Sequence, residues 1–205
     1  MVFQQRKGGL SMVEALPVGG DFAEVRALNR LFVDFLAGRA RRGGDCLGLG
    51  RRAAVALRAA DPASLETLAE FPRALFQVRV PRGRACRVAD LQAAATDVSR
   101  YVLQVTILHS AWTLSRHNPY LAKLLLGLED QDVRELATLD LAEIPAHCAA
   151  AETVVCAFAQ YAWLWHKLLT ESRPEVRRQL LLIALQPRVD ATHSSARLSA
   201  RKASA

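Results

Sequence analysis

The sequence lacks the features that mark membrane proteins and secreted proteins. Its 205 residues include only four cysteines, at positions 46, 86, 148 and 156, and no C-x-x-C pair. No apolar run approaches the roughly 20 residues that a membrane helix needs, and residues 1–16 have no apolar core of a secretory leader. Since disulfides persist mainly in oxidising compartments, these absences predict a cytoplasmic protein with free thiols and no membrane contact.

Catalytic and metal-binding motifs are also absent. The sequence has no glycine-rich phosphate loop, no G-x-S-x-G and no H-E-x-x-H. His147, Cys148, Cys156 and His166 are of the residue types that bind zinc, but their spacing fits no ligand knuckle. We therefore interpret the two cysteines as small apolar core residues. We expect no enzyme activity, no metal and no cofactor.

The composition that remains is typical of a basic helical protein. Hydrophobic residues make up 51% of the chain and aromatic residues only 6%, with Leu and Ala dominating, which favours helices. The net charge is +7, and Arg outnumbers Lys by 23 to 4. Residues 1–100 contain 16 Lys and Arg against 10 Asp and Glu, whereas residues 101–205 contain 11 against 10. A basic first half indicates nucleic acid or an acidic protein as partner.

The clearest helical pattern lies in residues 121–158. An apolar run ends at Leu126-Gly127-Leu128, and an acidic turn then precedes a helix with apolar residues at helical spacing, Val133 and Leu136. Asp140 is placed to cap a second short helix, because an aspartate before an apolar helical turn accepts hydrogen bonds from first-turn N–H groups. The stretch ends in the apolar residues 154–158.

The same pattern occurs 79 residues earlier without a gap. Leu126-Gly127-Leu128 then falls on Leu47-Gly48-Leu49, Leu136 falls on Leu57, and Asp140 falls on Asp61. An internal repeat of this length predicts two similar helical units in one chain.

Cap, breaker and periodicity signals predict the remaining elements. We expect a helix from Asp21 that ends at Gly38, and a helix that starts at Asp61-Pro62. Pro145 should kink its helix or delay its start. The other expected elements are helices at 50–60, 88–117, 151–170 and 175–185, and a short extended piece at 75–80.

Several of these segments resemble FlhD, the smaller subunit of the flagellar master transcriptional regulator. Residues 61–70 resemble the family's L-P-x-M-V-K-L-A-E segment, and residues 75–80 resemble V-C-H-F-R-F. Both L-G-L steps match the family's L-G step, and residues 154–158 mirror the L-V-C-H-F end in the second copy. The usual arrangement of the family is not tandem.

The resemblance implies an all-α fold with two FlhD-like units in tandem. Its expected divisions are a disordered N-terminus at 1–20, unit 1 at 21–86, unit 2 at 87–172, a C-terminal helix at 173–186 and a disordered basic tail at 187–205. It also implies a non-enzymatic activator subunit that controls flagellar or motility genes and acts on DNA with an FlhC-like, zinc-containing partner. The chain would form a homo-oligomer, or its two units would pair within one chain.

Two groups of arginines are candidates for phosphate contacts. Arg79, Arg82, Arg84 and Arg87 have no acidic residue among them and flank Pro81 and Gly83, so we predict that they contact the DNA backbone. The alternative is a solvated linker between the two units. A second group, at positions 39, 41, 42, 51 and 52, we interpret as solvated surface.

Apolar and aromatic positions are candidates for protein contacts. The predicted interface residues are Leu126, Leu128, Leu136, Val155 and Trp163. Phe158, Tyr161, Trp163 and Trp165 cannot share one helical face, so we expect some in the core and some in an oligomer contact. The alternative function is a helical adaptor or chaperone-like protein of a bacterial secretion or motility system, with no role on DNA.

Overall fold

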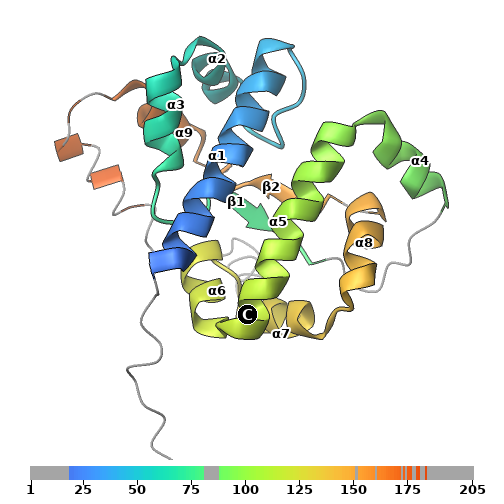
Figure 1. Ribbon diagram of the computed structural model, residues 1–205. Coiled ribbons are helices and arrows are strands. Elements are labelled where there is room, and N and C mark those ends of the chain that lie inside the picture. Colours follow the sequence, from blue (N-terminus) through green and yellow to red (C-terminus); the bar gives the residue numbers. More distant parts are fainter. Residues whose placement is uncertain are drawn as a thin grey trace, which may run out of the picture.

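The predicted all-α class is confirmed by a computed structural model of the chain. The structure describes residues 19–80, 88–150, 152–159 and 161–171, and residues 173, 175, 176, 179, 180 and 183. Most of these are helical (Figure 1). The elements are α1 (Gly19–Arg41), α2 (Arg51–Ala59), α3 (Pro62–Ala69), β1 (Phe76–Val78), α4 (Val88–Thr96), α5 (Val98–His117), α6 (Pro119–Leu126), α7 (Asp130–Thr138), a 3-10 turn (Leu141–Glu143), α8 (Ile144–Ala150), β2 (Val154–Cys156) and α9 (Ala162–Thr170).

Side-chain caps fix several of the predicted helix starts. The Asp61 carboxylate accepts a hydrogen bond from the Ser64 N–H (2.6 Å), with proline at the first position of α3. Asn118 ends α5 and caps α6, where its side chain accepts from the Leu121 N–H (3.1 Å). Asp140 accepts from the Ala142 N–H (3.0 Å). Each contact satisfies a first-turn donor that the helix itself leaves unpaired.

Both L-G-L steps are turns that need glycine. Gly48 has φ +80° and Gly127 has φ +68°, a left-handed conformation that other residues adopt only with strain. Each turn is bonded to the strand region of the other half of the chain. The Cys156 N–H donates to the Leu47 carbonyl (3.2 Å), and the Ala74 N–H donates to the Leu125 carbonyl (2.8 Å).

The elements recur at the predicted offset. α2 begins at Arg51 and α7 at Asp130, 79 residues later, and both contain nine residues. α1 and α5 are offset in the same way, although α6 replaces the loop that follows α1. β1 and β2 pair antiparallel, with Gln77 opposite Val155. The strands that correspond at this offset therefore pair with each other across the two halves.

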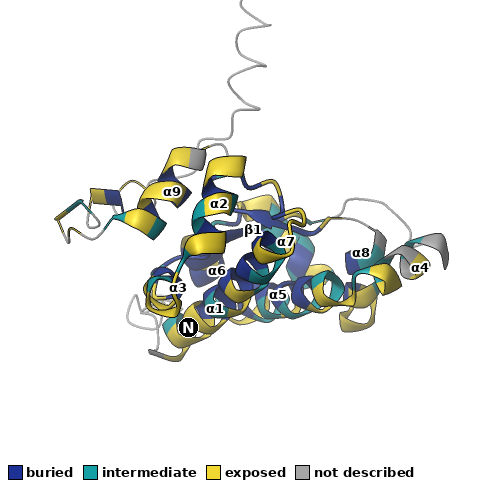
Figure 2. Cartoon of the chain, turned by 90° about the horizontal axis from the view of Figure 1, so that it is seen from above, coloured by how far each residue is buried: buried dark blue, intermediate teal, exposed yellow. Residues whose placement is uncertain are grey.

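The core lies around this strand pair, between α1 and α5 on one side and α2 and α9 on the other (Figures 1 and 2). Phe32 and Phe76 meet edge to face with ring centroids 5.6 Å apart. α9 packs against α2 and α3 of the first half, although it follows β2, whereas α4 packs against α8 and α5 of the second half. The halves therefore share one continuous core.

Three predicted helix boundaries are wrong. α1 begins at Gly19 and passes through Gly38 to Arg41, because Gly43, with φ +71°, supplies the left-handed stop. The helix expected over 88–117 is interrupted at Asp97, which caps α5 by accepting from the Arg100 N–H (3.2 Å). In the helix expected over 151–170, residues Val154–Cys156 instead form β2, because pairing with β1 overrides a periodicity that a short apolar run leaves ambiguous.

Some predicted segments fall outside the described residues. These are residues 1–18, residues 81–87 and the tail at 187–205. Of the helix predicted at 173–186, the structure describes six residues, of which 175, 176, 179, 180 and 183 are helical. None of the described helices is long and apolar enough to cross a membrane.

Candidate nucleic-acid interface

Only one of the four arginines predicted to contact DNA can be placed. Arg79 is exposed and directly follows β1, and its backbone N–H donates to the Thr153 carbonyl (2.8 Å). Arg82, Arg84 and Arg87 lie outside the described residues. Phosphate contact by these four residues stays a prediction.

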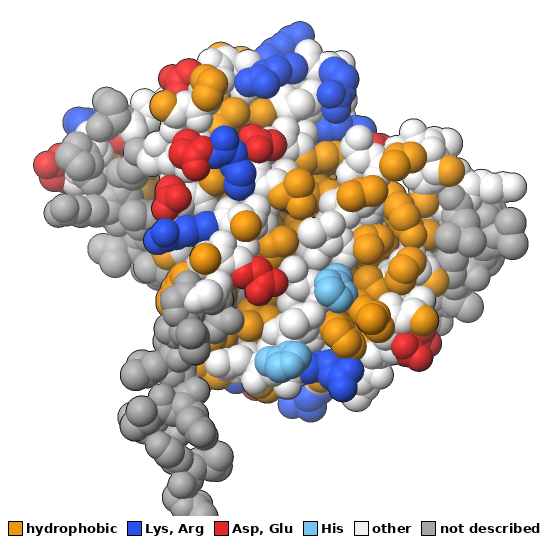
Figure 3. Space-filling view, in the orientation of Figure 1, with side chains coloured by type: hydrophobic (Ala, Val, Ile, Leu, Met, Phe, Trp, Pro, Cys, Tyr) orange, Lys and Arg blue, Asp and Glu red, His pale blue; other side chains and the backbone are white. Residues whose placement is uncertain are grey.

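A second set of arginines gathers where α1 ends and α2 begins. Arg41 is the last residue of α1, Arg42 lies in the following turn, and Arg51 and Arg52 open α2. Arg58 joins them from the last turn of α2, where its guanidinium donates to the Arg41 carbonyl (3.4 Å). All five are exposed, and Figure 3 shows Lys and Arg side chains along this upper edge. We call these five residues the arginine cluster.

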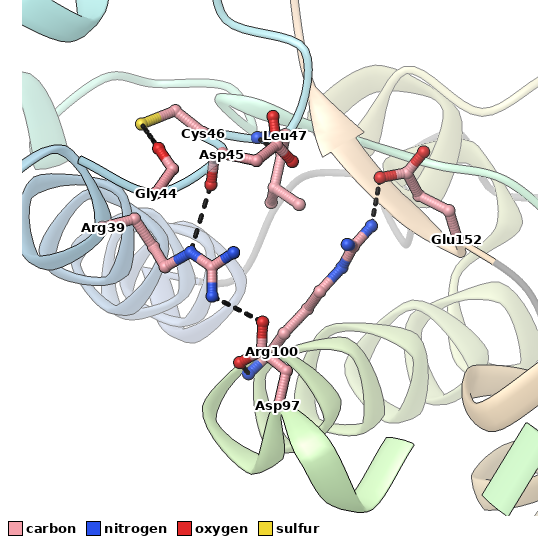
Figure 4. Close-up of polar contacts among 8 residues, drawn as sticks. All are labelled: Arg39, Gly44, Asp45, Cys46, Leu47, Asp97, Arg100 and Glu152. Carbon is pink, nitrogen blue, oxygen red and sulfur yellow. Dashed lines mark hydrogen bonds and ion pairs between the residues drawn. The ribbon is translucent and has the colours of Figure 1, made fainter. Parts of the chain in front are cut away.

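Two arginines near the arginine cluster, Arg39 and Arg100, are paired with carboxylates (Figure 4). Arg39 pairs with the Asp97 carboxylate (2.5 Å) and donates to the Asp45 carbonyl (3.1 Å). Arg100 pairs with Glu152. In the part of the chain that the structure describes, no acidic side chain forms an ion pair with a member of the arginine cluster.

Arg51 and Arg52 oppose the dipole of their own helix. The first turn of α2 contains no acidic residue, and its N-cap, Gly50, offers no side-chain acceptor. Cations at a helix N-terminus are unfavourable by about 0.3–1 kcal/mol each, whereas anions bind there readily. The corresponding helix α7 has Asp130 and Asp132 in its first turn, the arrangement that stabilises a helix. Arg51 and Arg52 therefore favour the binding of an external anion at the N-terminus of α2, whereas they do not stabilise the helix.

The predicted interface residues divide between core and surface. Leu126, Leu128, Leu136 and Val155 are buried inside this one chain, and Trp163 is half exposed. Among the other aromatic residues, Trp165 is fully buried and donates to the Ala157 carbonyl (2.7 Å), whereas Tyr161 is exposed. Part of the aromatic group thus lies in the core, as expected, whereas the oligomer contact expected of the rest stays a prediction.

The cysteines lie in apolar surroundings. Cys46, Cys148 and Cys156 are free and buried. Burial raises the pKa of Cys148 to about 11 and also raises the pKa of Cys46 and of Cys156. Within the described residues, no group of three His, Cys, Asp or Glu side chains is arranged to hold a metal ion.

Local sequence gives little indication of the arginine cluster. Arg41, Arg42, Arg51 and Arg52 look like ordinary surface when taken alone. Comparison at the offset of 79 supplies the missing signal, since those positions correspond to Tyr120, Leu121, Asp130 and Gln131.

Comparison of the chain with family models, curated proteins and solved structures finds no match.

Proposed function

We propose that this chain is a non-enzymatic, cytoplasmic regulatory subunit of FlhD type that acts on DNA together with an FlhC-like, zinc-containing partner. Its targets would be flagellar or motility genes. One observation supports the DNA role most: five exposed arginines form no ion pairs with described acidic residues, and two of them oppose the dipole of α2. Guanidinium groups bind phosphate oxygens in bidentate fashion, and such contacts position a protein on DNA without reading its sequence.

The arrangement of the two halves supports the FlhD-like proposal. Corresponding helices recur at a constant offset and corresponding strands pair. Two FlhD-like units would in this way form an intramolecular pseudo-dimer. A covalent link raises the effective concentration of the second unit to roughly millimolar.

The DNA role is tested by replacing arginines with glutamine. The variant changes Arg41, Arg42, Arg51 and Arg52, and the control changes Arg26, Arg30, Arg116 and Arg134. Both variants lose four positive charges. Binding of the full chain to a fluorescent duplex is measured by anisotropy across a salt series. We expect the first variant to bind more weakly and to lose about 0.9 in the slope of log affinity against log salt for each lost phosphate contact. The control should keep most of the slope.

Equal slopes for the two variants, or no binding by the unaltered chain at low salt, would remove the proposed role of the arginine cluster. The earlier prediction is tested on the same duplex with glutamine at Arg79, Arg82, Arg84 and Arg87.

The second candidate is a helical adaptor or chaperone-like protein with no role on DNA. It is favoured by large exposed hydrophobic side chains, among them Tyr161 and Trp163 beside α2 and α3. Apolar exposure of this kind fits protein contacts. A chain that does not bind the duplex would move this candidate ahead.

A further inference from the structure

The outward face of α5 is unusually apolar for a surface helix. Val98, Val102, Val105, His109 and Trp112 follow one another at alternating steps of four and three residues, the spacing that lets two helices pack along their length. Val98 is 57% exposed and Val102 is 54% exposed. We call these five residues the α5 face.

The matching face of the first half is polar, although its backbone is equivalent. At the offset of 79, Val105 corresponds to Arg26 and His109 to Arg30. Arg26 pairs with Glu70 (3.3 Å), and Arg30 pairs with Glu66 and with Asp34 (3.0 Å). The positions of Glu66 and Glu70 are Pro145 and Ala149 in the second half. In Figure 3, charged side chains accordingly gather over α1 and α3, and hydrophobic ones over α5 and α8. Exposure to water does not require the faces of α1 and α5 to differ in this way. We therefore interpret the face of α1 as adapted to water and the α5 face as adapted to a partner.

Aromatic contacts order the C-terminal half of the α5 face. The Trp112 indole N–H donates to the Leu139 carbonyl (3.0 Å), and its ring stacks against His109 with centroids 5.9 Å apart. The Arg116 guanidinium lies over the same ring at 4.8 Å. Trp112 is thus held in place before any partner binds, which lowers the entropy cost of association.

The charges at the two ends of α5 identify the partner as a second copy of this chain. Residues 39–58, beside the N-terminal end of α5, contain six arginines and one acidic residue. Residues 116–143, which include the last turn of α5 and the segment beside its C-terminal half, contain six acidic residues and three basic ones, and one of each sign is paired, Lys123 with Asp130. If two α5 helices pack antiparallel, the basic end of each copy lies beside the acidic end of the other. Complementary charges at the rim of an interface set orientation and exclude wrong pairings.

We propose that two copies of this chain associate through the α5 face about a two-fold axis, with their α5 helices antiparallel. The contact is distinct from the pairing of the two halves within one chain. The contact places the stretch between Arg100 and Arg116, which contains no Lys, Arg, Asp or Glu, at the centre of the interface. Because the protein is net positive, charged residues there would bring like charges of the two copies together. The proposal does not depend on binding to DNA.

The test is the mass of the full chain in solution, measured by light scattering across a concentration series at low salt. We expect twice the 22.5 kDa of the single chain at micromolar concentration. Val102→Glu buries a carboxylate from each copy in an apolar contact and should weaken the dimer at least about 100-fold, since removing an unpaired ion from water costs several kcal/mol. The matched control is Ala23→Glu, at the equivalent exposed position of α1, and it should leave the dimer intact. Circular dichroism should report an unchanged fold for both variants.

Three outcomes would overturn the proposal. A monomer at all concentrations would leave the α5 face to a different protein. A dimer that both variants retain would place the interface elsewhere. Dissociation of both variants alike would mean that added charge, and not the α5 face, controls association.

Discussion

Replacing Asn29 with alanine should destabilise the protein by about 3 kcal/mol or more, since three buried backbone groups would lose their partner at about 1–3 kcal/mol each. Asn29 is fully buried on α1. Its side-chain amide donates to the Phe71 carbonyl (3.0 Å) and to the Arg73 carbonyl (2.9 Å), and its oxygen accepts from the Leu75 N–H (2.9 Å). One side chain thus joins α1 to the segment that leads into β1.

The prediction is checked by urea unfolding of Asn29→Ala beside Asn118→Ala. Asn118 makes one comparable contact, to the Leu121 N–H, at a half-buried helix cap, and its loss should cost about 1 kcal/mol. The difference between the variants is the informative quantity. Equal losses would show that water replaces the contacts of Asn29 and that the segment is not fixed by them.

Leu57→Ala and Leu136→Ala should each lower the free energy of unfolding by about 2–5 kcal/mol, because each removes a fully buried side chain and leaves a cavity. Both residues are 0% exposed, on α2 and α7 respectively, and lie 79 positions apart. Their equal burial is what the internal repeat requires.

The control for this pair is Val55→Ala on α2, since Val55 is 60% exposed and should change stability by no more than about 0.5 kcal/mol. Chemical unfolding of the three variants provides the measurement. A near-neutral result at either leucine would end the equivalence of the two positions.

Local signals predicted much of the fold. Asp61 and Asp140 cap the helices that they were expected to cap, because a side-chain oxygen next to a first turn acts over a few residues only. The offset of 79 residues predicted which helices correspond, because leucines that recur at this offset are buried in both halves. Pairing between strands that are far apart in the sequence was harder to predict. The strand at Val154–Cys156 depends on β1, far away in the sequence, and no periodicity in three residues reveals it.

The candidate site was harder to predict than the core. Arg41 and Arg51 are ten residues apart in sequence, and the turn with Gly43 at positive φ brings their helices together. Composition could not separate the neutralised Arg39 from its exposed neighbours, since its partner Asp97 lies 58 residues away. The sequence predicts a long helix at 88–117 but does not indicate which side of it meets solvent, so the α5 face is visible only in the fold.

The proposed role on DNA depends most on Arg51 and Arg52 binding an anion and contributing nothing to the fold. The double variant Arg51→Glu, Arg52→Glu separates the two, when its unfolding free energy and its affinity for a DNA duplex are measured on the same preparation. Acidic residues in the first turn of α2 should favour its dipole, so stability should stay level or rise by about 0.3–1 kcal/mol per residue. The affinity for the duplex should fall, with a flatter dependence on salt. Unchanged affinity together with lost stability would contradict the account, because the two arginines would then serve the fold alone.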